Sequence, residues 1–214
     1  MRGVGKEAEK IAAKRRDILE KAYELFSQRN IESVSLQDIA NETGYGIATL
    51  YRYFANKPTL VIEAATLKWK QFGEENRKRR PSADFAGMTA AQIFEFYLDS
   101  FLELYRNHKD LLRFNQFFNM YVQAEHIEAG DLQPYREMIG RLKERFHSIF
   151  LKAELDHTIR TDEPEEEVFS KTLHLMLAAV TRYAVGLVYI PEKGFDAEKE
   201  LLFLKELLLR DYRV

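Results

Sequence analysis

Apolar side chains recur at intervals of three and four residues along most of this chain. In the first thirty residues the series includes Ile11, Ile18, Ala22 and Phe26. This spacing puts the apolar residues on one face of a helix. Glycine and proline, the residues that interrupt helices, number only 10 and 5 among 214 residues. The pattern therefore predicts an all-α fold rather than a turn-rich β architecture.

Signals for helix ends divide the chain into nine segments. Ser35 with Asp38, and Thr89 with Gln92, have the three-residue spacing of a capping box. Further helix starts are expected at Asn56, Asp162 and Asp196. The predicted helices cover about 8–29, 35–43, 47–53, 57–72, 90–107, 109–126, 133–156, 164–189 and 196–212. The charged, proline-containing stretch 78–86 predicts a loop.

Composition excludes several classes of protein. Cysteine is absent, which excludes disulfides and thiolate metal sites and is typical of a cytoplasmic protein. The charged N-terminus lacks the apolar segment of a signal peptide. The longest apolar run, 173–190, has Arg182 in its middle, so we expect a buried helix and no membrane partner. The five histidines share no spacing suited to a metal, and no phosphate loop or nucleophile motif occurs, so we expect no cofactor and no enzyme.

The segment 35–54 predicts two short helices joined by a tight turn. Ala40 offers a small side chain where the helices touch, and Gly44 tolerates the left-handed backbone that the turn needs. Such a unit presents its second helix outward, where it can enter the major groove of DNA. The alternative, an interior helical hairpin, fits poorly because the second helix carries several polar side chains.

The side chains of that second helix suit contact with DNA. Thr49, Tyr51 and Tyr53 carry hydroxyls for phosphate oxygens, and Arg52 and Lys57 add positive charge. Residues 1–57 hold ten Lys/Arg and eight Asp/Glu, a balance of +2, while the remainder is −4. The asymmetry is small and is compatible with a nucleic-acid partner for the N-terminal part.

The same region resembles the TetR family of transcriptional regulators. The resemblance covers residues 16–60 and rests on many positions at fixed spacing: Ile18-Leu19, Ala22, Leu25-Phe26, Ser35, Ile39-Ala40, Gly44, Thr49-Leu50-Tyr51, Tyr53-Phe54, Lys57 and Leu60. It implies an N-terminal three-helix DNA-binding domain, here 1–57, and a C-terminal helical bundle for ligand binding and dimerisation, here 58–214. The implied function is repression at a palindromic double-stranded DNA operator by a homodimer, relieved by a small-molecule effector.

The resemblance also assigns contacts by position. It implies contacts with bases from Gln37, Ile47, Ala48 and Arg52, and contacts with phosphates from Thr49, Tyr51, Tyr53 and Lys57. Asn30, Tyr45 and Gly46 depart from the family pattern. Gly46 stands where a Ser or Thr is usual, so we expect the DNA contact there to use backbone amides and the neighbouring apolar surface.

Aromatic side chains recur at helical spacing in the C-terminal part. Such stripes are more often plain core than a ligand box, so both interpretations stay open. If a pocket exists, we expect an apolar, aromatic one with few polar anchors. The candidate ligand-binding residues are Trp69, Phe94, Tyr97, Phe101, Phe114, Phe117, Phe118, Tyr121, Phe146 and Phe150.

The segments 164–189 and 196–212 are apolar over a broad face. A helix without a polar face must be covered on both sides, and a second subunit is one way to cover it. A wholly intramolecular core is the alternative. The candidate dimer-interface residues are Leu177, Val180, Thr181, Ala184, Leu204 and Leu208.

Two further functions remain open. A DNA-binding regulator of the same fold can answer to a protein partner instead of a small ligand. An all-α enzyme or lipid carrier is the third hypothesis, although the sequence contains no catalytic constellation to support it.

Overall fold

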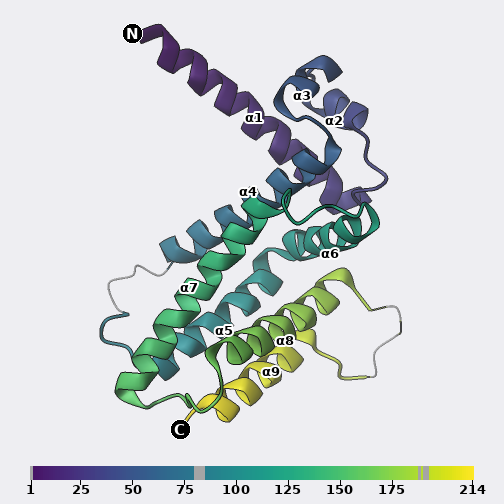
Figure 1. Cartoon of the computed structure of the whole chain (residues 1–214). Helices are drawn as coiled ribbons and strands as arrows, with labels where there is room; N and C mark the ends of the chain where they lie inside the picture. Colours follow the sequence, from purple (N-terminus) through teal and green to yellow (C-terminus); the bar gives the residue numbers. More distant parts are fainter. Residues whose placement is uncertain (1, 80–84, 188, 190–192) are drawn as a thin grey trace. The chain divides into compact units, whose positions relative to one another are not determined.

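The computed structural model describes residues 2–79, 85–187, 189 and 193–214. Within these residues the chain forms helices and one isolated β-bridge, between Ile159 and Arg213 (Figure 1). The helices are α1 (Arg2–Arg29), α2 (Leu36–Thr43), α3 (Ile47–Tyr53), α4 (Lys57–Arg79), α5 (Ala90–Asn107), α6 (Lys109–Ala124), α7 (Gln133–Asp156), α8 (Glu165–Val185) and α9 (Ala197–Tyr212). The all-α prediction is confirmed.

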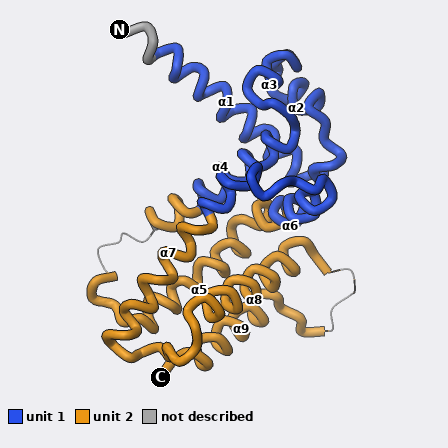
Figure 2. Tube along the Cα trace, viewed as in Figure 1, with its two compact units in different colours: residues 1–72, 114–138 blue, residues 73–113, 139–214 orange. Residues whose placement is uncertain are grey.

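The chain divides into two compact units (Figure 2). Unit 1 comprises residues 1–72 and 114–138, and unit 2 comprises residues 73–113 and 139–214. Helices α4, α6 and α7 therefore each contribute residues to both units. The predicted boundary between residues 57 and 58 separates a DNA-binding domain from a ligand-binding and dimerisation domain. Those two roles are not defined by compactness, so this boundary stays a prediction.

Unit 1 has a core drawn from α1 to α4 and α6. Its largest fully buried side chains include Phe26, Ile39, Leu50 and Phe54. From α6, the Phe114 ring packs against Phe26 at a centroid distance of 6.4 Å. Burying this much aromatic and branched surface is what stabilises α2 and α3, because helices of eight and seven residues are too short to persist alone.

Unit 2 is built on contacts among α5, α8 and α9. Its core includes a buried lysine: Lys205 of α9 is 7% exposed, and its Nζ binds Asp99 at 2.7 Å and Glu95 at 3.1 Å on α5. Burial lowers the pKa of Lys205, but hydrogen bonds and attraction to the two carboxylates outweigh it and raise that pKa. The ammonium therefore stays charged inside the unit.

Side chains fix the starts of several helices, as predicted. Both capping boxes form, at the start of α2 and at the start of α5. The Asn56 Oδ1 accepts the Thr59 N–H at 2.9 Å, and the Asp196 side chain accepts two amides of α9. These local signals lie within four residues of the groups they satisfy, which is why the sequence predicts them.

Other predicted helix bounds are wrong. α1 begins at Arg2 rather than near residue 8. α4 continues to Arg79, so the predicted loop 78–86 begins later, and its residues 80–84 lie outside the described chain. α6 ends at Ala124 and not at 126, and α8 ends at Val185 because Gly186 takes a φ of 110°.

The start of α8 also differs from its prediction. Pro164 occupies the cap position and supplies no side-chain hydrogen bond. Asp162 binds Arg160 instead, at 2.8 Å. Proline suits a helix start because it has no N–H to leave unpaired and its φ is already helical.

None of the helices in the described residues combines the length and apolar character needed to cross a membrane.

Candidate nucleic-acid interface

The turn between α2 and α3 is set by local backbone chemistry. The Ser35 N–H donates to Asp38 Oδ2 at 2.7 Å, and the Asp38 N–H donates to Ser35 Oγ at 3.1 Å. At the other end of α2, Gly44 has a φ of 70°, a backbone conformation that residues with a Cβ rarely adopt. Ala40 is 2% exposed, so α2 packs closely by its small side chain. The two helices therefore meet as the sequence predicts.

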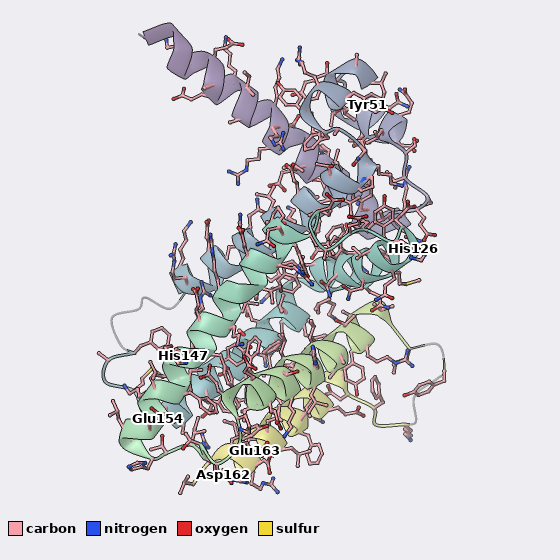
Figure 3. The ribbon with its side chains drawn as sticks, in the orientation of Figure 1. Tyr51, His126, His147, Glu154, Asp162 and Glu163 are labelled. Atoms are coloured by element: carbon pink, nitrogen blue, oxygen red, sulfur yellow. The ribbon has the colours of Figure 1, made fainter. Side chains whose placement is uncertain are left out.

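Helix α3 has one buried side chain and three exposed ones. Leu50 is fully buried, whereas Tyr51 is 57% exposed (Figure 3). Ala48 and Arg52 are exposed as well. The Arg52 guanidinium lies 5.4 Å from the Tyr53 ring centroid, a cation–π contact. An exposed helix face with aromatic, cationic and small side chains has the chemistry needed to contact bases and phosphates.

The remaining predicted contact residues surround this face. Gln37 on α2 is exposed, and its Nε2 donates to Asn41 Oδ1 at 2.9 Å. Gly46 is exposed at the α3 N-cap without a side-chain cap, and its carbonyl accepts the Thr49 N–H at 2.8 Å. Ile47 and Thr49 are half-buried. Their roles at DNA remain predictions.

Lys57 is held differently from a free phosphate-binding lysine. Its ammonium lies 5.5 Å from the Tyr121 ring centroid and donates to the Glu32 carbonyl at 3.4 Å. Burial lowers the pKa of Lys57, although the charges of Glu125 and Glu32 oppose that shift. A phosphate would have to compete with these contacts, so the predicted role of Lys57 stays open.

Sequence reasoning missed Arg15. Its Nη1 donates to the Tyr53 carbonyl at 2.7 Å, and its Nη2 binds both carboxylate oxygens of Glu63 at 2.5 Å. The guanidinium also lies 4.6 Å from the Phe54 ring centroid. One side chain on α1 thus binds the end of α3 and the body of α4. Its partners lie 38 and 48 residues away in sequence, so no local pattern identifies them.

The turn residue Tyr45 is bound by α1. A hydrogen bond to the Asp17 carboxylate raises the pKa of Tyr45. The Lys14 ammonium lies 5.8 Å from the Tyr45 ring centroid. Tyr45, which departs from the family pattern, therefore links the turn between α2 and α3 to α1.

A sequence profile described as "Bacterial regulatory proteins, tetR family" matches residues 18–64. The matched range holds α2, α3, the end of α1 and the start of α4. Over residues 18–64 the chain is similar to the TetR family of regulators. This confirms the resemblance predicted from the spacing of residues 16–60.

Known relatives agree over this domain. The HTH-type transcriptional regulator SAB2452 of Staphylococcus aureus (strain bovine RF122 / ET3-1) is 44% identical over 48 residues, which are 22% of this chain and 26% of that protein. The match thus spans about a quarter of the length of that curated relative. That protein is named as a transcriptional regulator.

Solved structures agree over most of the chain. FadR from Bacillus subtilis, in complex with stearoyl-CoA, has a TM-score of 0.68 at 17% identity and covers 91% of this chain and 97% of that one. The ketosteroid regulator KstR2 of Mycobacterium tuberculosis has a TM-score of 0.63 at 15% identity and covers 94% and 95%. At such low identity these likenesses establish the fold alone.

The candidate ligand-binding residues fall into two groups, one in each unit. In unit 2, Tyr97 lies 5.4 Å from Phe146 and 5.5 Å from Phe101 between ring centroids. The unit 2 cluster consists of Phe94, Tyr97, Phe101, Phe146 and Phe150. The candidates in unit 1 are Trp69, Phe114, Phe117, Phe118 and Tyr121. Of these, Phe114 packs on α1 as core, and the Tyr121 ring contacts Lys57.

Tyr97 stands out within the unit 2 cluster. Its hydroxyl is buried and has no hydrogen-bond partner among the described residues. Burial raises the pKa of Tyr97. Buried polar groups usually have a partner, so an orphaned hydroxyl among rings needs an explanation.

A hollow of about 370 Å³ lies elsewhere on unit 2. It is lined by residues of α7 and the first turn of α8, namely Gly140, Lys143, Glu144, His147, Glu165 and Glu166. The His147 Nδ1 and Glu165 Oε2 lie 2.7 Å apart. None of the predicted ligand-binding residues lines this hollow.

The predicted interface residues lie mostly inside the protomer. Leu177 and Leu204 are half-buried, while the buried ones are Val180, Thr181, Ala184 and Leu208. Their dimer role is untested. The apolar side chains that α8 and α9 expose are others: Leu175, Val185, Leu202, Phe203 and Leu207.

Proposed function

We propose that this protein is a transcriptional repressor that binds palindromic double-stranded operator DNA as a homodimer and is released by a hydrophobic or aromatic small molecule. The observation that carries the proposal is the exposed face of α3, where Tyr51 and Arg52 are free of the core that Leu50 fills.

The DNA part follows from the anchoring of α3. A seven-residue helix needs outside support to stay folded. The Arg15 bond to the Tyr53 carbonyl and the burial of Leu50 supply that support. A short, rigidly held helix with an exposed polar face fits the major groove, where base edges carry distinct donor and acceptor patterns.

The dimer part follows from exposed apolar surface. Phe203 is 62% exposed and Leu175 is 50% exposed, on helices that contact each other within unit 2. Large apolar side chains exposed on two packed helices offer a surface that a twofold axis would cover with its own copy. Two copies also match the two half-sites of a palindrome.

The effector part follows from the unit 2 rings. A ligand with an apolar body and one polar group would pack on Phe101 and Phe146 and give the Tyr97 hydroxyl a partner. FadR from Bacillus subtilis, which shares the fold, was solved with stearoyl-CoA. This supports an apolar effector without specifying which one.

Arg52→Ala and Lys57→Ala test the DNA part. An operator duplex is first selected from a random library with the wild-type protein. We expect Arg52→Ala to lose about 1–3 kcal/mol of binding free energy for that duplex and to relax the base preference at one position of each half-site. We expect Lys57→Ala to weaken all duplexes alike and to flatten the salt slope by roughly one per protomer. Fluorescence anisotropy measures both, with the exposed Arg136→Ala as control.

The two variants separate base contact from phosphate contact. Identical behaviour of Arg52→Ala and Lys57→Ala would contradict the division of roles. Unchanged binding in both would contradict the proposal that α3 reads the operator.

Tyr97→Phe tests the effector part. We expect some member of a panel of fatty acids, acyl-CoAs and aromatic acids to raise the melting temperature of the wild type. Tyr97→Phe keeps the ring but removes the hydroxyl, so the same ligand should bind roughly tenfold more weakly, a loss typical of one hydrogen bond. Half-buried Tyr105→Phe is the control. A panel without effect on the wild type would contradict this part and favour control by a protein partner.

A further inference from the structure

The positive charge of the N-terminal part lies outside the helix-turn-helix. Residues 17–57 contain four Lys/Arg and six Asp/Glu, a balance of −2. Residues 2–16 contain six Lys/Arg and two Asp/Glu, a balance of +4. Attraction to phosphates supplies most of the sequence-independent affinity of a DNA-binding protein. The net charge of residues 17–57, which include the helix-turn-helix, is negative, so it would not attract DNA.

The basic segment forms the free end of α1. Every residue of 6–14 is exposed, and from residue 6 onward the first core residue of α1 is Ile18. Figure 1 shows this stretch of α1 extending beyond α2 and α3. A helix end that buries nothing gains no stability from packing. Its composition therefore points to contact with something outside the protomer.

Three lysines form a row along this helix end. Lys6, Lys10 and Lys14 are spaced four residues apart, so they share one face over about 12 Å of helix. Like charges at this spacing repel and weaken a free helix. Lys6 and Lys10 form no ion pair with any described residue. A polyanion that neutralises the row would turn this repulsion into attraction.

The row continues onto the predicted DNA-contact surface. Lys14 contacts the ring of Tyr45, the residue just before the Gly46 cap of α3. All of these residues belong to unit 1. The lysine face of α1 and the start of the recognition helix are therefore adjoining parts of one surface.

We infer that Lys6, Lys10 and Lys14 form a second DNA-contact element, which binds backbone phosphates next to the segment read by α3. The inference rests on the proposed function and adds to it: α3 selects the sequence, and the α1 row supplies the salt-dependent affinity. Phosphate contacts of this kind position a protein on the duplex and carry no sequence information.

The double variant Lys6→Gln/Lys10→Gln tests this element. Both side chains are exposed and remote from the core, so folding should be unchanged by circular dichroism. Affinity for the selected operator duplex is measured by anisotropy between 50 and 300 mM KCl, a range in which phosphate contacts change binding strongly. We expect the slope of log K against log salt to fall by about 0.9 for each lost contact, so by about 2 per protomer. The base preference should be unchanged.

Lys193→Gln/Lys199→Gln removes the same charge from exposed positions of unit 2 and serves as the matched control. A slope equal to that of the wild type in Lys6→Gln/Lys10→Gln would overturn the inference while leaving the function of α3 intact. An equal fall of the slope in both double variants would also overturn it, because net charge alone would then explain the effect. A wild-type protein that selects no duplex would overturn the proposed function and the inference together.

Discussion

At the residue scale, the Arg15 guanidinium binds the Tyr53 carbonyl and both oxygens of Glu63. The Tyr53 carbonyl lies in the last turn of α3, where helix carbonyls lack partners within the helix. A planar guanidinium can satisfy a carbonyl and a carboxylate at once, which a lysine ammonium does less well. The orientation of α3 thus depends on a residue of α1 as well as on its own sequence.

Arg15→Lys should therefore destabilise unit 1 although it keeps the charge. The Arg15 side chain is 37% exposed, so solvent screening reduces the worth of the ion pair, and we expect a loss of about 1 kcal/mol. Urea unfolding measures this change. Arg16→Lys is the control, because the Arg16 side chain is 67% exposed and its ion pair is long, with 3.8 Å between Nε and the Glu20 Oε1. An equal effect of both substitutions would contradict the account.

Asp156 provides a second residue-scale test, through pH. Its Oδ2 accepts the Ala90 N–H at 2.7 Å, so the end of α7 caps the start of α5. Burial raises the pKa of Asp156, but hydrogen bonds from Ala90 and Thr158 outweigh it and hold that pKa below the ordinary value of 3.8. A carboxyl with a lowered pKa stabilises the fold above its unfolded pKa, and that stabilisation is lost as the pH falls below it.

We expect the wild type to lose more of its free energy of unfolding between pH 6 and pH 3 than Asp156→Asn does. Asparagine keeps an acceptor oxygen but does not titrate, so the variant is weaker at pH 6 and less sensitive to acid. Urea unfolding at the two pH values measures the difference. Equal acid sensitivity of the two proteins would show that Asp156 contributes nothing through its charge.

At the element scale, α3 is the helix with the weakest local signals. Gly46 gives it no side-chain cap, and the turn before it depends on the left-handed Gly44. The other short helix, α2, has a complete capping box. Contacts with neighbouring elements therefore stabilise α3. The two glycines that precede it, Gly44 and Gly46, should respond to substitution in opposite ways.

Gly46→Ser should stabilise unit 1 by a few tenths of a kcal/mol, because a serine at the cap can accept an amide of the first turn. A Cβ at Gly46 meets nothing within 4 Å, and its φ is −64°. Gly44→Ala should destabilise by about 1 kcal/mol because the φ of 70° strains any side chain. Thermal unfolding compares the two. A stabilising Gly44→Ala would contradict the role of the turn.

The elements also show what sequence could and could not predict. Capping boxes such as Thr89 with Gln92 connect groups three residues apart, so the start of α5 is predicted correctly. The first turns of α1 contain Gly3 and Gly5 and no cap signal, so the pattern places the start of α1 too late. Helical propensity there is weak, and the extension is visible only in the structure.

The features that the sequence does not predict depend on contacts between residues far apart in the chain. The bond from Arg15 to Glu63 and the contact of Lys57 with Tyr121 join residues more than forty positions apart. Hydrophobic periodicity identifies the buried face of each helix but not which faces meet. Val180 and Leu208, two of the predicted interface residues, are buried within the protomer, and their role in a dimer stays a prediction.

At the scale of the whole molecule, the proposed dimer depends on the apolar surface that α8 and α9 leave exposed. Leu175, Phe203 and Leu207 are between 40% and 62% exposed. The same helices bury their other faces against α5. A second copy that covers the exposed side chains would leave the internal core unchanged, as expected for a twofold interface.

Phe203→Asp should convert a dimer to a monomer, because it places a charge where the partner's apolar surface would remove water. Light scattering after size-exclusion chromatography should show the molar mass fall from twice the chain mass to the chain mass. Leu155→Asp, at the 84% exposed Leu155 of α7, should leave the mass unchanged. A monomeric wild type, or a dimer that tolerates Phe203→Asp, would contradict this interface.

The central claim is that the exposed face of α3 reads DNA. Selection of duplexes from a random library with the purified full chain tests it most directly. The account predicts a palindromic consensus whose half-sites lie about one helical turn apart, roughly 10 base pairs between their centres. A selection that enriches no sequence at low salt, with the protein folded, would contradict it.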